Sequence, residues 1–337
     1  MKIVLRATCV LLALSTLLWT KAYSENDDFH FLLSQAQAIA PTVDSFDQFV
    51  KEIDSPLLKS TDGVLFYCNT LIAYPGRKTN ESYNIPRKTA SIAAEAFSYM
   101  QEPYLRILSF PSECEEIPSD LFSTEGLSEI IEYRVADDNN VYADLDGFLI
   151  NNITKTIIAY PRGKDTEVLY FPDSIKHIGK SAFAYDKNIK EIILPEELIS
   201  IGDYAFEWCI SLERVSFGTF LEEIGVSAFE ACGALQVVAL PGSLRTINPL
   251  AFAQSDRLQS VILEEGCEII GDGAFMGCPI QEIFLPASLM FIGDDALGKI
   301  APNIFDWPLR VHTVEGSYAE SFVRSNFPET KVIFEEP

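Results

Sequence analysis

The chain carries an internal repeat with a period of 23 residues, and this period limits the possible folds more than any other feature. A phenylalanine recurs at this interval, and an isoleucine stands five positions before each one. The series ends with a leucine after an interval of 22 residues. Its members are Phe183, Phe206, Phe229, Phe252, Phe275 and Leu297, preceded by Ile178, Ile201, Ile224, Ile247, Ile270 and Ile292.

The same offsets occur earlier in the chain, around Phe97 and Phe122, so the sequence contains eight units. A unit of this length cannot close a hydrophobic core alone, and successive units must therefore stack. Its Leu-x-x-Val-x-Leu segment alternates as a short strand does. The glycine after most of the isoleucines suits a tight turn, and we expect the Ala-Phe pair on a short helical turn. The sequence predicts a mainly β solenoid with short helical turns.

The unit LPEELISIGDYAFEWCISLERVSF, residues 194–217, resembles the BspA-like, or treponemal-type, leucine-rich repeat. It shares the length of that repeat and the order of Pro, Ile-Gly, Ala-Phe, Cys and Leu. DGVLFYCNTLIAYPGRK (62–78) and DGFLINNITKTIIAYPRGK (146–164) are similar to the hairpins that this family inserts between repeats. VEGSYAESFVRSNFPETKVIF (314–334) is similar to its closing segment. The resemblance implies a leucine-rich repeat solenoid from a family of surface or secreted adhesive proteins.

The first 24 residues are typical of a secretory signal peptide. Lys2 and Arg6 precede an apolar run that is too short to span a bilayer, and small residues follow at Ala22 and Ser24. We therefore expect a secreted or cell-surface protein without membrane insertion after signal removal. Because solenoid ends need covering, we expect an N-terminal helical cap in 25–60 and a C-terminal cap in 309–337. The solenoid would occupy 61–308, with hairpin insertions near 62–78 and 137–164.

Charge restricts the partners of this chain. It has 49 acidic and 25 basic residues and a formal net charge of −24. Such a chain repels nucleic acid and anionic membranes. The alternative, which is favoured, is that the charge only keeps the protein soluble. The partner that we expect is an extracellular protein or glycoprotein.

The sequence contains no pattern that predicts catalysis, a cofactor or a metal. It lacks HExxH, GxSxG and phosphate-loop motifs, and His30, His177 and His312 are widely separated. DDNNVYADLDG (137–147) could be a calcium loop or an acidic hairpin turn. The turn is favoured, because Tyr142 stands where an EF-hand register needs an oxygen ligand. We therefore predict a protein that is not an enzyme.

Cysteines follow the repeat. Cys209, Cys232 and Cys278 each stand three residues after a repeat phenylalanine, which favours packing in the core. The alternative is a disulfide between Cys209 and Cys232, because these residues lie on adjacent coils, which stack at roughly 4.8 Å.

The third and fifth positions of each strand segment should point outward, and they supply the candidate binding residues. The fifth position is more apolar than a solvent-exposed column requires, which indicates an interaction surface. The alternative is that these residues favour strands and are covered by a neighbouring segment. The candidates are Ile193, Arg214, Val237, Ala239, Ile262 and Phe284. We expect an adhesin-like binding protein, for instance for host matrix proteins, or alternatively a self-assembling extracellular or envelope scaffold.

Overall fold

The computed structural model describes Val50, Met100 and residues 57–75, 78–98, 104–297, 309–328 and 331–334. The predicted signal peptide lies outside the described residues. The predicted N-terminal cap also lies outside them, except for Val50 and residues 57–60. The domain boundaries given above otherwise remain predictions.

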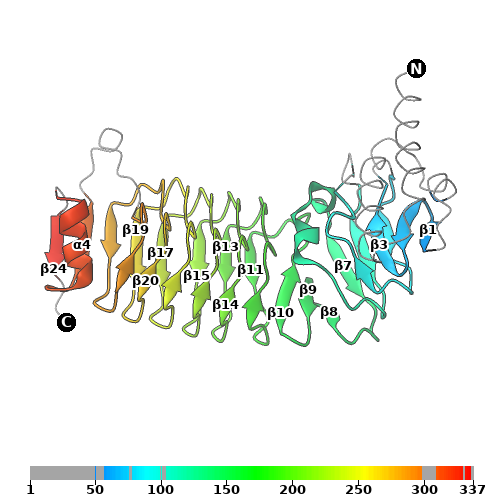
Figure 1. The fold of residues 1–337 in the computed structure, drawn as a ribbon, viewed down its shortest axis with the longest axis horizontal. Coiled ribbons are helices and arrows are strands. Elements are labelled where there is room, and N and C mark those ends of the chain that lie inside the picture. Colours follow the sequence, from blue (N-terminus) through cyan, green and yellow to red (C-terminus); the bar gives the residue numbers. More distant parts are fainter. Residues whose placement is uncertain are drawn as a thin grey trace, which may run out of the picture.

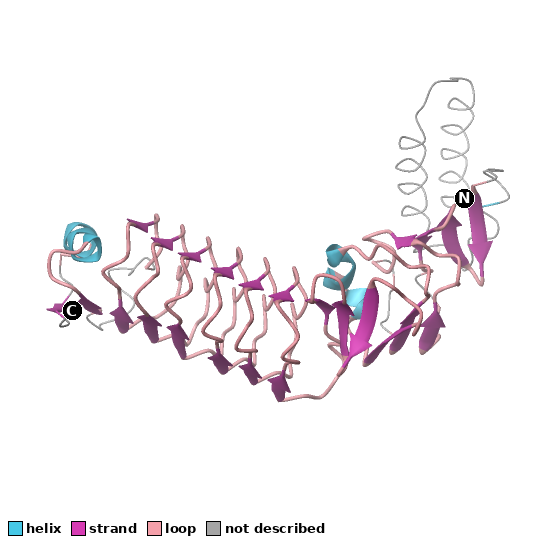
Figure 2. Cartoon of the chain, turned by 90° about the horizontal axis from the view of Figure 1, so that it is seen from below, coloured by secondary structure: helices cyan, strands magenta, loops and turns pink. Residues whose placement is uncertain are grey.

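The described chain is a leucine-rich repeat solenoid whose coils follow one another along one axis (Figure 1). Figure 2 shows two rows of strands along opposite sides of the coils. One row is a nine-stranded sheet. Its parallel members are β10 (Thr156–Ala159), β12 (His177–Ile178), β14 (Ser200–Ile201), β16 (Glu223–Ile224), β18 (Thr246–Ile247), β20 (Ile269–Ile270) and β22 (Phe291–Ile292), and β9 (Phe148–Asn151) and β8 (Tyr142–Leu145) extend it antiparallel.

The second row contains the Leu-x-x-Val-x-Leu segments and consists of two parallel sheets in the C-terminal part. The first has three strands, β11 (Val168–Tyr170), β13 (Glu191–Ile193) and β15 (Arg214–Ser216). The second has five strands, β17 (Val237–Leu240), β19 (Ser260–Leu263), β21 (Glu282–Phe284), β23 (Arg310–Thr313) and β24 (Lys331–Phe334). These strands keep the register of the repeat, so equivalent residues lie side by side.

The N-terminal part repeats this arrangement. One sheet contains β1 (Leu58–Thr61), β2 (Val64–Tyr67), β3 (Thr70–Ala73) and β5 (Ser91–Ile92), and the other contains β4 (Ser82–Asn84), β6 (Ile107–Phe110) and β7 (Glu132–Val135). The 3₁₀ helices η1 (Ser119–Ser123) and η2 (Glu125–Leu127) follow in this region. Strand β1 begins inside the range predicted to be a helical cap, because Leu58 pairs with Tyr67 across a hairpin.

The C-terminal segment forms the helix α4 (Tyr318–Asn326) followed by β24. The Ser317 hydroxyl accepts a hydrogen bond from the backbone N–H of Glu320 at 3.1 Å, and the Glu320 carboxylate accepts one from Gly316 at 2.7 Å. Side-chain caps of this kind satisfy N–H groups that a helix start leaves unpaired.

Repeat phenylalanines form a continuous aromatic stack inside the solenoid. Neighbouring rings lie 4.8–5.4 Å apart and within 14° of parallel from Phe183 to Phe275. Each phenylalanine N–H also donates to the alanine carbonyl of the next Ala-Phe pair, as from Phe206 to Ala228 at 2.7 Å. The Ala-Phe pair is therefore both a packing unit and a hydrogen-bonding unit between coils.

Each of the two hairpins contributes a tyrosine that stacks on the phenylalanine of the following coil. Tyr160 stacks on Phe183 at 5.4 Å and donates its N–H to Ala182. Tyr74 stands in the same relation to Phe97 at 5.2 Å. Both tyrosines precede their phenylalanine by the repeat interval of 23 residues, so each Ala-Tyr-Pro ending is an Ala-Phe pair in another form.

The segment around the Ala-Phe pair was expected to be a short helical turn, and in the coils from 172 to 297 it is a run of tight turns. The residues two before and two after the phenylalanine have positive φ, for example 57° at Tyr204 and 58° at Trp208. Alternate N–H groups then bond within the turn and to the next coil. Only the coil of Phe122 forms a 3₁₀ helix here.

The glycine that follows most of the isoleucines lies close to the backbone of the preceding coil and does not have a positive φ. A Cβ added at Gly225 would lie 2.6 Å from the backbone nitrogen of Asp203, and one at Gly202 would lie 2.9 Å from that of Lys180. A side chain at either position therefore requires a shift of the neighbouring backbone, and the coil of Asn248 accommodates one by donating the amide to the Ile224 carbonyl at 2.9 Å.

Arg162 connects the two parts of the solenoid, whose core residues form two clusters. Its guanidinium donates to the carbonyls of Phe122 at 3.0 Å, Thr124 at 2.6 Å and Ala184 at 3.4 Å. Burial lowers the pKa of this guanidinium. The arginine therefore satisfies backbone acceptors at the place where regular stacking is broken.

We expect Phe229→Ala to lower the free energy of unfolding by about 3–5 kcal/mol, because it opens a cavity in the middle of the aromatic stack. Chemical denaturation measures the change, and Phe220→Ala is the control because Phe220 is exposed. A loss below about 1 kcal/mol would contradict the role of the stack.

Arg162→Met should cost about 2–4 kcal/mol, because two or three carbonyls lose a charged donor while the aliphatic packing is kept. Arg162→Lys should fall between Met and the parent, since an ammonium group cannot reproduce the fork of donors. Equal stability of the Met variant and the parent would show that these bonds are replaced by solvent.

Candidate functional site

The candidate site is the outward face of the second row of strands. In each strand the middle residue of the repeat triplet points inward, as Val238 and Val261 do, and its two neighbours point outward. The period of two residues in a strand causes this alternation. Parallel register then places equivalent outward residues in two columns that cross the sheets.

Three of the predicted residues form one continuous column. Ala239 lies beside Ile262, and Ile262 lies beside Phe284. Val237 lies on the same face, two residues before Ala239, and is 51% exposed. Ala239 is exposed, and Ile262 and Phe284 are half-buried. We name Val237, Ala239, Ile262 and Phe284 the apolar column.

The other two predicted residues lie apart from the apolar column. Ile193 is half-buried in β13, and Ser216 is its neighbour in β15. Strand β15 belongs to a different sheet from β17. Arg214 is exposed, but its guanidinium pairs with the Glu191 carboxylate at 2.8 Å. Neither residue contributes to one continuous apolar surface.

Two outward residues were missed in the sequence. His312 extends the column, and its ring stacks on Phe284 with centroids 4.0 Å apart. Tyr170 holds the same register in β11 and is 67% exposed. Tyr170 precedes Ile193 by 23 residues, so the period could have identified it. His312 follows Phe284 by 28 residues, and no periodic signal points to it.

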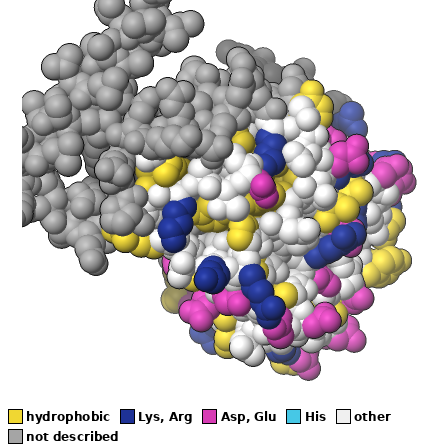
Figure 3. Space-filling model, turned by 90° about the vertical axis from the view of Figure 1, so that its right-hand side faces the viewer, with side chains coloured by type: hydrophobic (Ala, Val, Ile, Leu, Met, Phe, Trp, Pro, Cys, Tyr) yellow, Lys and Arg dark blue, Asp and Glu magenta, His cyan; other side chains and the backbone are white. Residues whose placement is uncertain are grey.

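Ion pairs on this face also follow the stacking of the coils. The hydrogen bond from Arg214 holds the pKa of Glu191 below its usual value. The Glu282 carboxylate lies 3.3 Å from Arg310 and 3.0 Å from the His312 imidazole. At the N-terminal end of the molecule, Figure 3 shows acidic and basic side chains interspersed with hydrophobic ones. The arginine side chains of the Glu191 and Glu282 pairs are exposed, so these ion pairs add little stability.

The cysteines occupy structural positions. Each of the three that follow a repeat phenylalanine donates its thiol to the phenylalanine carbonyl of the preceding coil, at 3.1–3.3 Å. Ser255 makes the same contact at 3.4 Å. Cys209 and Cys232 are buried free thiols in the structure, so they pack in the core and do not form a disulfide with each other.

Burial raises the pKa of these thiols. The pKa of Cys278 rises to about 12, and that of Cys209 rises well above its usual value. Within the part of the chain that the structure describes, no group of three or more His, Cys, Asp or Glu side chains could hold a metal ion. No helix among the same residues is long and apolar enough to cross a membrane.

Comparison with known proteins places these features in one family. The model of the BspA type leucine-rich repeat region matches residues 73–141 and 172–301 in six copies, which is more than half of the chain. A search of the curated proteins finds no match.

Solved bacterial structures share the fold at low identity. A leucine-rich repeat protein of Eubacterium ventriosum has a TM-score of 0.54 and 18% identity, over 62% of this chain and 55% of its own. The pneumococcal vaccine antigen PcpA has a TM-score of 0.53 and 16% identity, over 84% and 88%. A leucine rich cell surface protein of Faecalibacterium prausnitzii has a TM-score of 0.51 and 20% identity, over 64% and 59%. The chain therefore spans less than two thirds of the Eubacterium and Faecalibacterium proteins.

Thiol labelling tests the assignment of the cysteines. In the native protein at pH 8, we expect Cys209, Cys232 and Cys278 to react with iodoacetamide at least about a hundredfold more slowly than the exposed Cys68, because only the thiolate reacts. Peptide mass spectrometry reads each site, and unfolding in denaturant should make all four react. A Cys209–Cys232 peptide linked by a disulfide under non-reducing conditions would contradict the assignment.

Proposed function

Because the chain belongs to the BspA type leucine-rich repeat family, we propose that it is a non-catalytic binding protein that holds an extracellular protein or glycoprotein against its apolar column. Repeat proteins of this kind build extended surfaces for binding, and their stacked coils hold those surfaces in fixed positions.

The apolar column is the observation that carries this proposal. Ala239, Ile262 and Phe284 occupy successive strands, and His312 extends their row. An exposed or half-exposed apolar row in a chain of net charge −24 is a feature that a partner can cover. Charged groups at its edge, such as Glu282 and Arg310, would form a polar rim around it.

We also propose that the protein acts outside the cell. The segment that contains Lys2, Arg6 and the apolar run is typical of a secretory signal. Among the structures with the same fold, one is described as a cell surface protein and another as a vaccine antigen. Host matrix proteins and glycoproteins are therefore the partners to test first.

A charge placed in the apolar column should abolish binding. The parent protein is first tested against a panel of immobilised matrix proteins and mucins. For any panel protein that binds it, we expect Phe284→Glu and Ile262→Glu to weaken the affinity at least about tenfold, because the buried carboxylate would have no hydrogen-bond partner. Biolayer interferometry measures the affinity.

Phe291→Glu is the matched control, because Phe291 is 49% exposed in β22 of the opposite sheet. Unchanged affinity in both apolar-column variants would contradict the proposed face. Sedimentation that shows self-association of the parent, lost in Phe284→Glu, would favour the scaffold function instead.

A further inference from the structure

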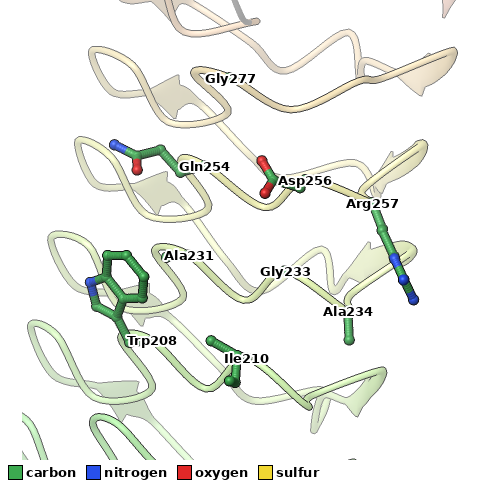
Figure 4. A pocket seen from close by; sticks show the side chains of 9 residues that line it. All are labelled: Trp208, Ile210, Ala231, Gly233, Ala234, Gln254, Asp256, Arg257 and Gly277. Atoms are coloured by element: carbon green, nitrogen blue, oxygen red, sulfur yellow. The ribbon is translucent and has the colours of Figure 1, made fainter.

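A second surface feature lies on the turns that follow the Ala-Phe pairs. It is an open trough of about 560 Å³ that spans four successive coils, the last of which contributes only Gly277. Trp208 and Ile210 form one wall and Gln254, Asp256 and Arg257 form the other. The coil between them contributes Ala231, Gly233 and Ala234, which form the floor (Figure 4). We name this feature the Trp208 trough.

The trough exists because one coil lacks side chains that its neighbours have. Ring centroids in the stack beneath are 5.0 Å and 5.1 Å apart, so the coils of Trp208 and Gln254 are separated by about 10 Å. Figure 4 shows the Trp208 indole rising to the level of Ala231, and the Arg257 side chain descending to the level of Ala234. Both side chains extend toward the coil between them, whose residues Ala231, Gly233 and Ala234 are small.

Gly233 is not required by the fold. A Cβ built at Gly233 meets nothing within 4 Å. Its backbone N–H donates to Ala231 at 2.9 Å, and the N–H of Ile210 makes the same bond to Trp208 one coil earlier. Because a branched residue occupies the same position in the neighbouring coil, stacking alone does not explain the glycine.

The walls differ in chemistry. Trp208 is 46% exposed and Ile210 is 48% exposed, which is a large apolar surface for two adjacent side chains. On the other wall Gln254, Asp256 and Arg257 are exposed, and their side chains form no hydrogen bond or ion pair with other described residues. At another place on the surface an arginine is paired between coils, as Arg245 is with Glu268 at 3.2 Å. The trough therefore offers an aromatic face opposite free hydrogen-bonding groups.

We propose that the Trp208 trough binds a neutral hexopyranose residue of a glycan. A pyranose has an apolar face of C–H groups and an edge of hydroxyl groups, and these match the indole wall and the polar wall. Asp256 and Arg257 cancel in charge, and the net charge of −24 repels sulfated polyanions. Tyr185 is exposed in the coil before Trp208 and extends the aromatic wall for a second sugar residue.

The site is independent of the apolar column, so the two can be tested separately. The probe is an array of immobilised neutral, sialylated and sulfated oligosaccharides, followed by calorimetry with free oligosaccharides from the positive group. We expect neutral hexopyranosides to be bound, and Trp208→Ala to weaken their affinity at least about tenfold. Gly233→Tyr should have the same effect, because a Cβ at this position meets nothing within 4 Å and the added ring would occupy the trough.

Tyr170→Ala is the matched control, because it removes an exposed aromatic ring from the strand face. It should leave sugar affinity within about twofold, and circular dichroism of all variants should match the parent. Failure to retain any neutral sugar would overturn the proposal. Equal affinity of the parent and both trough variants would do the same, as would a trough-dependent partner that still binds after enzymatic removal of its glycans.

Discussion

The structure depends on hydrogen bonds from the turn of each coil to the turn of the next coil. Phe206 donates to Ala228 at 2.7 Å, and Tyr204 and Trp208 donate to the same neighbouring coil. These bonds require a positive φ at the residue two before and at the residue two after the phenylalanine. Left-handed geometry costs a non-glycine residue about 1–2 kcal/mol. The bonds and the aromatic stack compensate for that cost in the coils from Phe183 to Phe275. They also fix the coil spacing at about 5 Å, which favours glycine after the isoleucine in most coils.

The carbonyl groups of the repeat phenylalanines receive hydrogen bonds from different side chains along the solenoid. The carbonyl of each repeat phenylalanine from Phe183 to Phe252 receives a side-chain donor from the following coil, which is a cysteine thiol in three cases and the Ser255 hydroxyl in the fourth. At the junction before the second hairpin, Arg162 donates to the Phe122 carbonyl in the same way. The cysteine of the repeat is therefore a donor that fits an apolar core. This role explains why serine can replace it, and why adjacent cysteines need no disulfide.

The regular spacing of the repeats made most of the fold predictable from the sequence. Features could not be predicted where the spacing or the residue type departs from the repeat. The stack, the parallel register and the outward positions in β17, β19 and β21 follow from the 23-residue period. The same period contained Tyr160 and Tyr170, but these residues differ in type from their equivalents and were not recognised. His312 could not be found, because the interval between β21 and β23 departs from the period. The backbone conformation around the Ala-Phe pair could not be predicted either, because the period does not distinguish a helical turn from a run of turns with alternating φ.

Function must reside in positions that the stack leaves free, and the coils differ there for reasons that packing does not supply. At the position four residues after the phenylalanine, Ile210 and Gly233 make the same backbone hydrogen bond, and with Asp256 they differ in size and polarity. At the fifth position of the strands, the sequence changes from Ser216 to Ile262 while the inward neighbours remain aliphatic. Because a solenoid couples each coil mainly to its neighbours, such substitutions alter one surface without disturbing the others. The apolar column and the Trp208 trough can therefore diverge independently on one scaffold.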